Sequence, residues 1–312
     1  MINPDFVCGV LPGSLNRFTE AQLNYYRSCG QSAEIRAACL SGAFIGVESK
    51  SKVIEIEFII KGRARNYLGF DLEVDDRVIK SIRIDLLPEM KKMKLKLFQF
   101  SDEKTRKIKL YLPVSVAIEI LSFSAEGQPL KSPEKKLLCL GDSITQGMDA
   151  VFPFCTFPVI TAKILNADLI NQGVGGQIFD EKTSDENFPF QPDIITVAYG
   201  VNDWYRDFTI EKIEKSVFSY LEKLKKVFHQ SKIFVITPVW TNVEDQTKAA
   251  GNLQDVRNII ENIAQSTGCN VIDGLSLVPH NNFYFVDGIH PNETGHLIYG
   301  VNLANAIIKN YT

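Results

Sequence analysis

One serine lies where its hydroxyl could act as a nucleophile. Ser143 belongs to the segment GDSITQG (141–147), which directly follows the short apolar run Leu137–Leu140. Such a run is typical of a buried strand, and a glycine-flanked corner after it can present a side chain at the edge of a sheet. A serine hydroxyl is a poor nucleophile until a base accepts its proton. The corner could also be a tight turn with a capping side chain, so the base has to be found elsewhere.

The four histidines of the chain include one good candidate for this base. His229 ends a long amphipathic helical pattern, His280 follows a proline in a loop, and His296 lies inside the last helical pattern. His290 differs, because it lies in FVDGIHPNETG with Asp287 three residues before it. This spacing lets a carboxylate bind one ring nitrogen while the other ring nitrogen faces the serine. We therefore expect His290 to be the base and Asp287 to orient it.

A tetrahedral intermediate carries a negative oxygen, and two further segments could supply hydrogen-bond donors to it. In NQGVGG (171–176) the glycines let backbone amides approach a ligand closely, and in YGVND (199–203) Asn202 offers a side-chain amide. The amide of Ser143 is a third candidate. Taken alone, the first segment resembles a phosphate-binding loop, although it lacks the lysine of a P-loop, and the second could be a helix cap. Their occurrence together with a candidate nucleophile and base favours catalysis.

The second half of the chain has the pattern of a parallel sheet. Short apolar runs alternate there with helical patterns. The runs are 137–140, 168–171, 194–198, 233–237 and 270–272, and the helical patterns are 157–167, 209–230, 245–267 and 294–311. This alternation predicts a parallel sheet with helices on both faces. The candidate segments follow the ends of the predicted strands, where such sheets place their sites.

The first half alternates between apolar and polar residues with a period of two, which predicts an antiparallel sandwich. The alternating segments are 53–60, 70–86, 94–100, 106–113 and 116–123, with a hairpin turn expected at Asp75–Asp76–Arg77. Residues 17–26 could form a short helix or an edge segment. The polar segment 124–136 contains one glycine and two prolines and is the best linker candidate. We therefore expect two domains, 1–130 and 131–312.

Composition excludes several classes of protein. The chain has 312 residues and a formal net charge of −3, which argues against nucleic acid as the main partner because phosphate binding needs clustered Lys and Arg. No apolar segment is long enough to cross a bilayer. The six cysteines show no CxxC pair and no Cys/His metal-binding spacing. The first residues lack the features of a signal peptide, which favours reduced thiols and the cytoplasm, although a removed leader would leave the same sequence. The sequence gives no indication of the oligomeric state.

Four segments of the chain resemble the signature blocks of the SGNH family, also called GDSL hydrolases. They are GDSITQG (141–147), NQGVGG (171–176), GVND (200–203) and DGIH (287–290), in the order of the family. The resemblance covers about residues 135–312. It implies a three-layer α/β/α domain of flavodoxin type with a five-stranded parallel sheet, and ester hydrolysis without a metal or a cofactor.

The resemblance also implies a role for single residues. Ser143 matches the nucleophile, His290 the base and Asp287 its orienting acid. The amide of Gly176 and the side chain of Asn202 match the oxyanion donors, with the Ser143 amide beside them. The β-rich first half resembles the jelly-roll-like sandwich that precedes the catalytic domain in bacterial two-domain carbohydrate esterases.

The substrate is less clearly indicated. The candidates for substrate contact are Asp142, Trp204 and Trp240, although Trp240 could equally anchor a loop and Trp204 could cover the end of the sheet. Phenylalanines 152, 154 and 157 follow the serine and would narrow an acyl site toward small groups such as acetyl, or they belong to the core. Arg257 lies on a mixed helix face, where we expect it to be exposed to solvent.

Three classes of function fit these observations. The first is a serine esterase that removes short acyl groups, acetyl above all, from small-molecule or oligosaccharide substrates. The second is a lipase, lysophospholipase or thioesterase that acts on longer acyl chains. The third is a non-catalytic carbohydrate-binding protein, which the intact set of Ser143, Asp287 and His290 disfavours.

Overall fold

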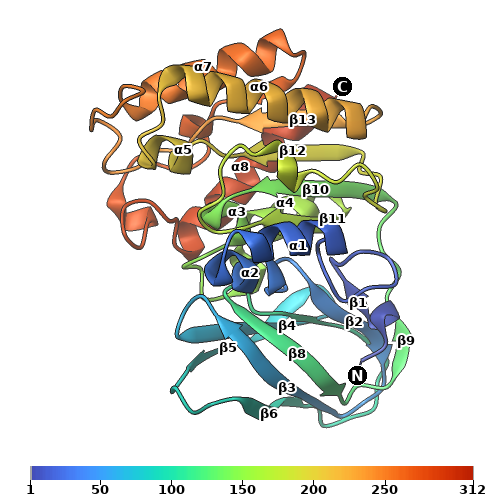
Figure 1. Cartoon of the computed structure of the whole chain (residues 1–312). Helices are drawn as coiled ribbons and strands as arrows, with labels where there is room; N and C mark the ends of the chain where they lie inside the picture. Colours follow the sequence, from blue (N-terminus) through green and yellow to red (C-terminus); the bar gives the residue numbers. More distant parts are fainter. Residues whose placement is uncertain (1, 312) are drawn as a thin grey trace.

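The chain folds into a β-rich first half and an α/β second half, and Figure 1 shows the first half below the second. The structure is a computed structural model and describes residues 2–311. The two parts match the two periodicities of the sequence, so the predicted fold class is confirmed. Within the described residues, no helix is both long and apolar enough to span a membrane.

The second half is built on a five-stranded parallel sheet, in the order β11-β10-β12-β13-β14. Its strands are β10 (Lys135–Gly141), β11 (Ala167–Gly173), β12 (Ile194–Ala198), β13 (Lys232–Ile236) and β14 (Asn270–Ile272). All neighbouring strands pair in parallel. The direction of strand order reverses at β10, so the loops after β10 and β12 flank a crevice at the carboxyl edge of the sheet.

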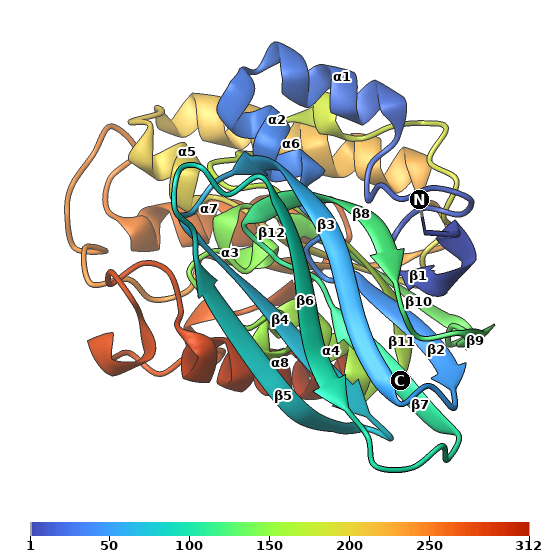
Figure 2. The same cartoon turned by 90° about the horizontal axis from the view of Figure 1, so that it is seen from below.

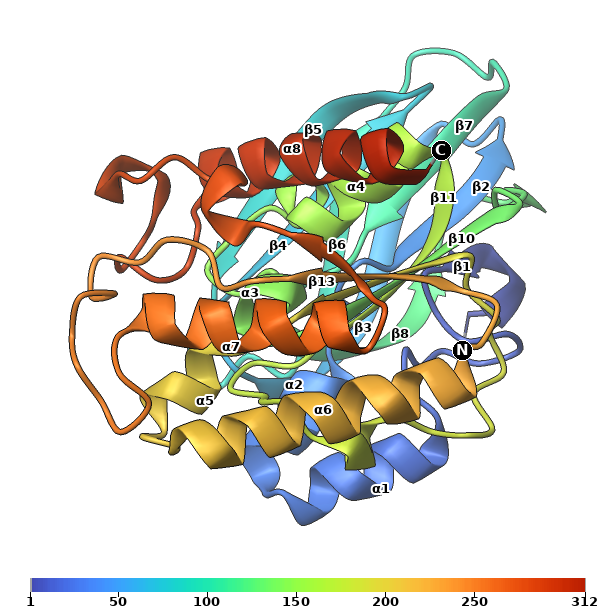
Figure 3. The same cartoon turned by 90° about the horizontal axis from the view of Figure 1, so that it is seen from above.

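Helices cover both faces of this sheet, as Figure 3 shows from above. They are α4 (Phe157–Leu165) and α8 (Glu293–Tyr311) on one face, and α6 (Ile210–Val227) and α7 (Leu253–Ser266) on the other. Successive residues of a strand point to opposite faces. Leu137 and Cys139 therefore pack with α4 and α8, whereas Leu138 and Leu140 pack with α6 and α7. This two-sided burial explains why the strands are apolar runs without alternation.

Helix α7 begins later than the sequence pattern predicts. Asn252 caps it, because its side chain accepts a hydrogen bond from the amide of Asp255 while the Asp255 carboxylate accepts one from the amide of Asn252. This reciprocal pair fixes the first turn. Residues 245–252 are therefore a loop, and the predicted helix over 245–267 is corrected to Leu253–Ser266.

The first half contains two antiparallel sheets, and Figure 2 views the molecule from their side. One sheet consists of β1 (Val7–Cys8), β2 (Phe44–Ser49), β7 (Arg106–Tyr111), β4 (Tyr67–Val74) and β5 (Arg77–Asp85), with β9 (Gly127–Pro129) paired to β2. The other consists of β6 (Lys92–Gln99), β3 (Val53–Arg63) and β8 (Val116–Phe123). Alternate residues of both sheets fill one core, in which the rings of Phe58 and Phe70 lie 5.5 Å apart. Asp75 and Asp76 form the predicted hairpin turn between β4 and β5 with positive φ angles of 48° and 65°.

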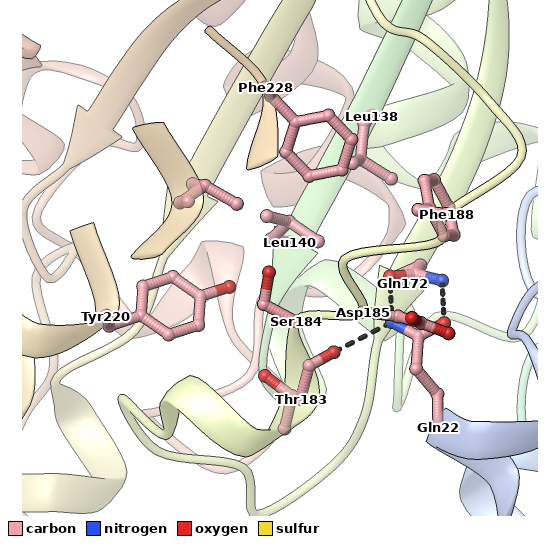
Figure 4. Close-up of a pocket in the computed structure, with 11 residues that line it drawn as sticks. Gln22, Leu138, Leu140, Gln172, Thr183, Ser184, Asp185, Phe188, Tyr220 and Phe228 are labelled. Carbon is pink, nitrogen blue, oxygen red and sulfur yellow. Dashed lines mark hydrogen bonds between the residues drawn. The ribbon is translucent and has the colours of Figure 1, made fainter. Parts of the chain in front are cut away.

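Two helices near the N-terminus contact the α/β half, and the second of them also packs on β3 and β8 of the sandwich. They are α1 (Glu20–Ser28) and α2 (Gln31–Ala38), so the helical alternative for residues 17–26 is correct. Tyr26 and Ala37 pack with Val174, which follows β11. Figure 4 shows Gln22 of α1 donating to the side chain of Gln172 at 3.1 Å beside a cavity of about 10 Å³. This cavity holds no more than one water molecule, so it is a packing gap between α1 and the face of the parallel sheet that α6 covers.

The remaining elements are short. Helices α3 (Ser143–Gln146) and α5 (Val201–Tyr205) follow β10 and β12. Turns of 3-10 helix lie at Pro4–Phe6, Pro153–Cys155, Glu181–Thr183, Gly274–Ser276 and Asn282–Tyr284. Strand β9 still pairs with the sandwich and ends at Pro129, whereas β10 of the parallel sheet begins at Lys135. We therefore propose the domain boundary between residues 130 and 131.

Candidate active site

Ser143 lies at the corner between β10 and α3. Asp142 caps α3, because its carboxylate accepts a hydrogen bond from the amide of Ile144 at 3.0 Å. A Cβ atom on Gly141 would lie 2.0 Å from Thr145 Oγ1, so the strand can turn into the helix this tightly only with glycine there. The corner places the Ser143 hydroxyl at the carboxyl edge of the sheet, as the sequence predicts.

The imidazole of His290 bridges Ser143 and Asp287. Its Nε2 lies 2.9 Å from Ser143 Oγ, and its Nδ1 lies 2.8 Å from Asp287 Oδ2. The other carboxylate oxygen accepts hydrogen bonds from the amides of Ile289 and His290, which folds the loop around the carboxylate. Burial raises the pKa of Asp287, but the hydrogen bonds from His290 outweigh it and lower this pKa below its ordinary value. An ionised Asp287 can hold the imidazole with Nδ1 protonated, and Nε2 is then free to accept a proton.

The three candidate oxyanion donors do not have the same surroundings. Gly176 has a positive φ of 81°, and its amide has no hydrogen-bond partner within residues 2–311. Ser143 is the first residue of α3, so no helical carbonyl accepts from its amide. The side-chain amide of Asn202 donates to the carbonyl of Gln177 at 3.0 Å and to the carboxylate of Asp142 at 3.3 Å. Asn202 must therefore give up the longer of these bonds to reach a substrate oxygen.

Gln146 fixes the glycine-rich loop to the nucleophile helix. Its side-chain oxygen accepts from the amide of Gly175 at 2.8 Å, and its side-chain nitrogen donates to the carbonyl of Val114 at 2.9 Å. A Cβ atom on Gly173 would lie 2.2 Å from the Gln146 amide nitrogen, so this close approach requires glycine. The sequence gives no signal for this role, because a glutamine inside a short helix has many possible partners.

Three arginines hold carbonyls of the same loop. Arg36 of α2 donates to the carbonyl of Gly175 at 2.9 Å, and Arg206 donates to that of Gly176 at 2.6 Å. Arg17 is 1% exposed and donates to carbonyls at the end of β11 and to that of Cys39, and its burial lowers its pKa to about 10. Sequence reasoning missed all three, since these partners are backbone carbonyls 22 or more residues away in the chain, which no local pattern reveals.

Two buried carboxyl groups lie behind the site. Burial raises the pKa of Asp142 to about 6, although the amide of Ile144 and the charge of His290 act in the opposite direction. Burial likewise raises the pKa of Asp203 to about 7. Asp142 is 3% exposed and both its oxygens have protein partners, so our expectation of a direct substrate contact is corrected to a capping and supporting role.

The two tryptophans pack in the protein. Trp204 has no exposed surface and its Nε1 donates to the carbonyl of Gly251 at 3.0 Å, so the prediction that it contacts substrate is wrong. Trp240 stacks on the ring of His280 and meets Phe285 edge to face. This favours the loop-anchor alternative for Trp240, and its contact with substrate stays a prediction.

Two other expectations near the site need correction. Phe157 has no exposed surface and stacks on Tyr299 at 4.0 Å, so it belongs to the core and does not line an acyl site. The side chain of Arg257 is 4% exposed rather than solvated. Arg257 donates to the carbonyl of Pro238 at 2.8 Å and pairs with Glu244 at 2.6 Å, which anchors the loop after β13.

The other histidines lie away from Ser143. His296 is buried beside Phe157, and its burial lowers its pKa to about 3, so its ring is neutral. His280 bonds the carbonyl of Leu275 at 2.9 Å, and His229 is exposed beyond the end of α6. Among the histidines, His290 is the one that the fold brings to the serine.

The acidic side chains beside His290 are joined to their neighbours by hydrogen bonds, and the large cleft lies elsewhere. Within residues 2–311, Asp149, Asp287 and His290 alone have donor atoms close enough to share a metal ion. Arg65 already binds both oxygens of Asp149, and His290 is bonded at both ring nitrogens. The donors therefore form a hydrogen-bonded network. A cleft of about 800 Å³ between the halves lies at the amino ends of β10 and β11, at the opposite edge of the sheet from Ser143.

Residues 139–298 match the GDSL-like Lipase/Acylhydrolase family, which is just over half of the chain. Curated protein sequences give no match.

Solved structures resemble the chain over nearly its whole length, sandwich included. A protein from Bacteroides ovatus described as a GDSL-like lipase has a TM-score of 0.80 at 17% identity, covering 97% of this chain and 94% of that one. A salicylyl-acyltransferase from a tetracycline biosynthetic pathway has a TM-score of 0.77 at 15% identity, covering 98% and 94%. An acetyl xylan esterase from the rumen bacterium Butyrivibrio proteoclasticus has a TM-score of 0.62 at 17% identity, covering 86% and 90%. At such identities the likeness is one of fold.

The matched segment 139–298 contains the serine corner, the glycine-rich loop, the asparagine loop and the histidine loop that meet at the carboxyl edge of the sheet. The chain therefore belongs to the GDSL-like lipase/acylhydrolase family and is an SGNH-type esterase.

Proposed function

We propose that the protein removes short acyl groups, acetyl first among them, from carbohydrate esters, with Ser143, His290 and Asp287 as its catalytic triad. The observation that carries this proposal is the continuous chain of contacts from Ser143 Oγ to His290 Nε2 at 2.9 Å and from His290 Nδ1 to Asp287 at 2.8 Å. Each member comes from a loop at the end of the sheet, and this geometry is the one that activates a serine.

The reaction then proceeds in two halves. In the first, Ser143 Oγ attacks the ester carbonyl while its proton passes to His290 Nε2, and His290 returns that proton to the departing alcohol. In the second, water attacks the acyl-enzyme, its proton passes to His290, and the acid leaves as Ser143 recovers a proton. Asp287 stabilises the imidazolium that forms in both halves.

The oxyanion is stabilised by the amides of Ser143 and Gly176 and by the side chain of Asn202. Within residues 2–311 the two backbone amides have no acceptor to give up, so they are preorganised for a negative oxygen. Asn202 exchanges its 3.3 Å bond to Asp142 for a bond to the substrate. Because the charged oxyanion of the transition state accepts a stronger hydrogen bond than the neutral carbonyl oxygen of the substrate, this exchange favours the transition state.

The substrate class is supported by the fold as a whole. The acetyl xylan esterase matches this chain over 86% of its length, including the sandwich, and its name gives both an acetyl group and a carbohydrate. The salicylyl-acyltransferase matches as well, and acyl transfer differs from hydrolysis only in the acceptor that attacks the acyl-enzyme. The Asp287 side chain is 47% exposed, so water reaches the triad, and this favours hydrolysis.

A series of p-nitrophenyl esters of increasing acyl length, run beside acetylated xylo- and manno-oligosaccharides, tests the proposal. We expect the highest kcat/KM for acetate and release of acetate from the oligosaccharides, with both activities lost in Ser143→Ala. A rate that rises with acyl length would indicate a lipase or thioesterase. Normal p-nitrophenyl acetate hydrolysis by Ser143→Ala would rule out the triad, and absence of labelling by a fluorophosphonate would favour a binding protein.

A further inference from the structure

A second carboxylate lies beside the imidazole of His290. Asp149 Oδ2 is 3.5 Å from His290 Nδ1, the atom that Asp287 Oδ2 approaches to 2.8 Å. The Asp149 side chain is 12% exposed, whereas that of Asp287 is 47% exposed. Water screens the charge of the more exposed group, so the buried carboxylate acts through a lower effective dielectric constant, which offsets its longer distance.

The sandwich fixes the orientation of Asp149. Arg65 Nε and Nη2 donate to its two oxygens at 2.6 and 2.7 Å, and the hydroxyl of Tyr67 donates to Oδ1 at 3.2 Å. Arg65 lies in the turn between β3 and β4, and Tyr67 is the first residue of β4. Such a two-pronged pair fixes direction as well as charge. Burial raises the pKa of Asp149, but the hydrogen bonds and charge of Arg65 outweigh it, so the pKa is lowered and the group is ionised.

The loop that carries Asp149 meets β4 at two further points. The amide of Phe154 donates to the buried carboxylate of Asp71 at 2.8 Å. A Cβ atom on Gly69 would lie 1.8 Å from the carbonyl oxygen of Val151, so the strand and the loop touch backbone to backbone. Asp149 itself has a φ of 72°, a left-handed conformation that costs energy in a residue other than glycine and persists where its surroundings hold it.

We propose that the sandwich takes part in the reaction by holding Asp149 as a second carboxylate partner of the His290 imidazole. Asp149 is then a positioning residue, which acts on the substrate only through His290, and Arg65 and Tyr67 aim its carboxylate. This inference rests on the proposed function, because an imidazolium forms only if His290 accepts the proton of Ser143. Both carboxylates approach the same ring nitrogen, Asp287 at hydrogen-bond distance and Asp149 as an ion pair, so each limits the loss that follows when the other is removed.

The charged and titratable groups around His290 agree with this arrangement. Asp287 faces it from its own loop, Asp149 from the loop after α3, and Asp142 from the cap of α3. His296 of α8 is neutral, since burial lowers its pKa to about 3. Arg65 is positively charged and binds both oxygens of Asp149, which keeps this carboxylate ionised beside the imidazole.

The competing explanation is that Arg65 and Asp149 merely join the two halves of the molecule. A second ion pair offers a matched control, because Lys163 of α4 binds the buried Glu73 of β4 at 2.5 Å. Lys163 also borders the cleft at the amino ends of β10 and β11, away from Ser143. Lys163→Gln removes a cross-domain ion pair and leaves the surroundings of His290 intact, and Glu73 keeps its second partner, Lys109.

The test is a double-mutant cycle of Asp149→Asn and Asp287→Asn, with Lys163→Gln as control, measured as kcat/KM for p-nitrophenyl acetate over pH 5–9. We expect losses of about 10-fold and about 30-fold for the single variants and about 10⁴-fold for the double variant, well beyond their product. Asp149→Asn also moves the acid limb of the profile to lower pH, because a carboxylate that favours the protonated imidazole is gone.

Two outcomes overturn the inference. In one, the double variant loses only the product of the single losses. In the other, Asp149→Asn leaves the acid limb in place and Lys163→Gln reproduces its loss of rate, which makes Asp149 a structural link. Both outcomes leave the proposed function standing as long as Ser143→Ala and His290→Ala are inactive, whereas an active Ser143→Ala removes the proposed function itself.

Discussion

The two halves of the molecule meet the site in different ways. The α/β half brings the candidate reacting groups, on four short loops that each follow a strand or precede a helix. Within the described residues, no side chain of the sandwich bonds Ser143, and instead β4 and the turn before it hold the loop after the nucleophile helix. One half therefore supplies the candidate reacting groups, and the other half holds the loop that carries Asp149 beside His290.

This difference predicts two kinds of response to mutation. A substitution among the reacting groups should lower the rate and leave folding intact, since these side chains lie at the edge of the sheet and contribute little to the core. A substitution where the sandwich touches the loop should change stability and rate together, because packing and placement share the same contacts. The following variants test this division, beginning with the largest expected effect.

The first variant pair compares two histidines six residues apart. His290→Ala removes the base, and we expect a fall in kcat of at least about 10⁴-fold with an unchanged unfolding midpoint. His296→Ala empties a buried site next to Phe157 and should cost about 2–4 kcal/mol of stability, with kcat of the folded protein within a few-fold of the original. Steady-state kinetics and urea unfolding measure both. Equal losses of kcat would contradict the assignment of His290 as the base.

Asn202→Ala separates the oxyanion site from the triad. We expect kcat to fall by about 10²–10³-fold, because one donor to the negative oxygen is lost. The bonds of Asn202 to Gln177 and Asp142 are also lost, so the stability should be measured alongside. Gln191→Ala, on an exposed loop, is a suitable control of similar chemistry. A variant that retains most of its kcat would exclude Asn202 from the oxyanion site.

Gly69→Ala tests the sandwich side. The new Cβ atom would overlap the carbonyl oxygen of Val151, which is backbone and cannot rotate away, so β4 and the loop must separate. We expect a loss of about 2–3 kcal/mol in stability and about 10-fold in kcat, since the loop carries Asp149. Gly46→Ala, which meets only the side chains of Phe44 and Leu130 at 3.1–3.4 Å, should change both much less. Full activity in a destabilised Gly69→Ala protein would show that placement of the loop does not matter.

The sequence predicts the reacting groups of the α/β half better than the contacts by which the sandwich holds the loop after the nucleophile helix. Asp287 and His290 are three residues apart, so their contact could be predicted from local spacing. The contact of His290 with Ser143 could be predicted because Ser143 follows the end of a strand in a parallel sheet. The sheet could be predicted because burial on two faces leaves apolar runs of a characteristic length.

The supports could not be predicted, because no local pattern links the residues concerned. Arg65 and Asp149 are 84 positions apart and belong to different halves, and an arginine in a turn between strands is usually solvated. The prediction for Trp204 was wrong because its position after the end of a strand is compatible with two arrangements. The side chain could contact substrate or pack in the core, and in the structure it is buried. Side-chain direction decides between these, and spacing does not determine it.

The smallest expected effect concerns Asp203, beside Asn202, and it is a dependence of stability on pH. Burial raises the pKa of Asp203 to about 7, above the ordinary value of 3.8 expected in the unfolded chain, so the folded state binds the proton more tightly. The stability from this group is therefore present at low pH and lost as pH rises toward 7. Between pH 5 and pH 8 we expect it to lower the free energy of unfolding by about 2 kcal/mol.

Asp203→Asn removes this titration, so the variant should lose about 2 kcal/mol less than the original protein between pH 5 and pH 8 in urea unfolding. The lowered pKa values of Asp149 and Asp287 act below this window and do not mask the effect. Asp142 acts in the same direction in both proteins and cancels in the comparison. The exposed Asp245→Asn serves as a control that should leave the pH dependence unchanged. If the free energy of unfolding changed with pH equally in Asp203→Asn and in the original protein, Asp203 would be ionised in its buried position. The α/β half would then contain a buried charge that its surroundings do not explain.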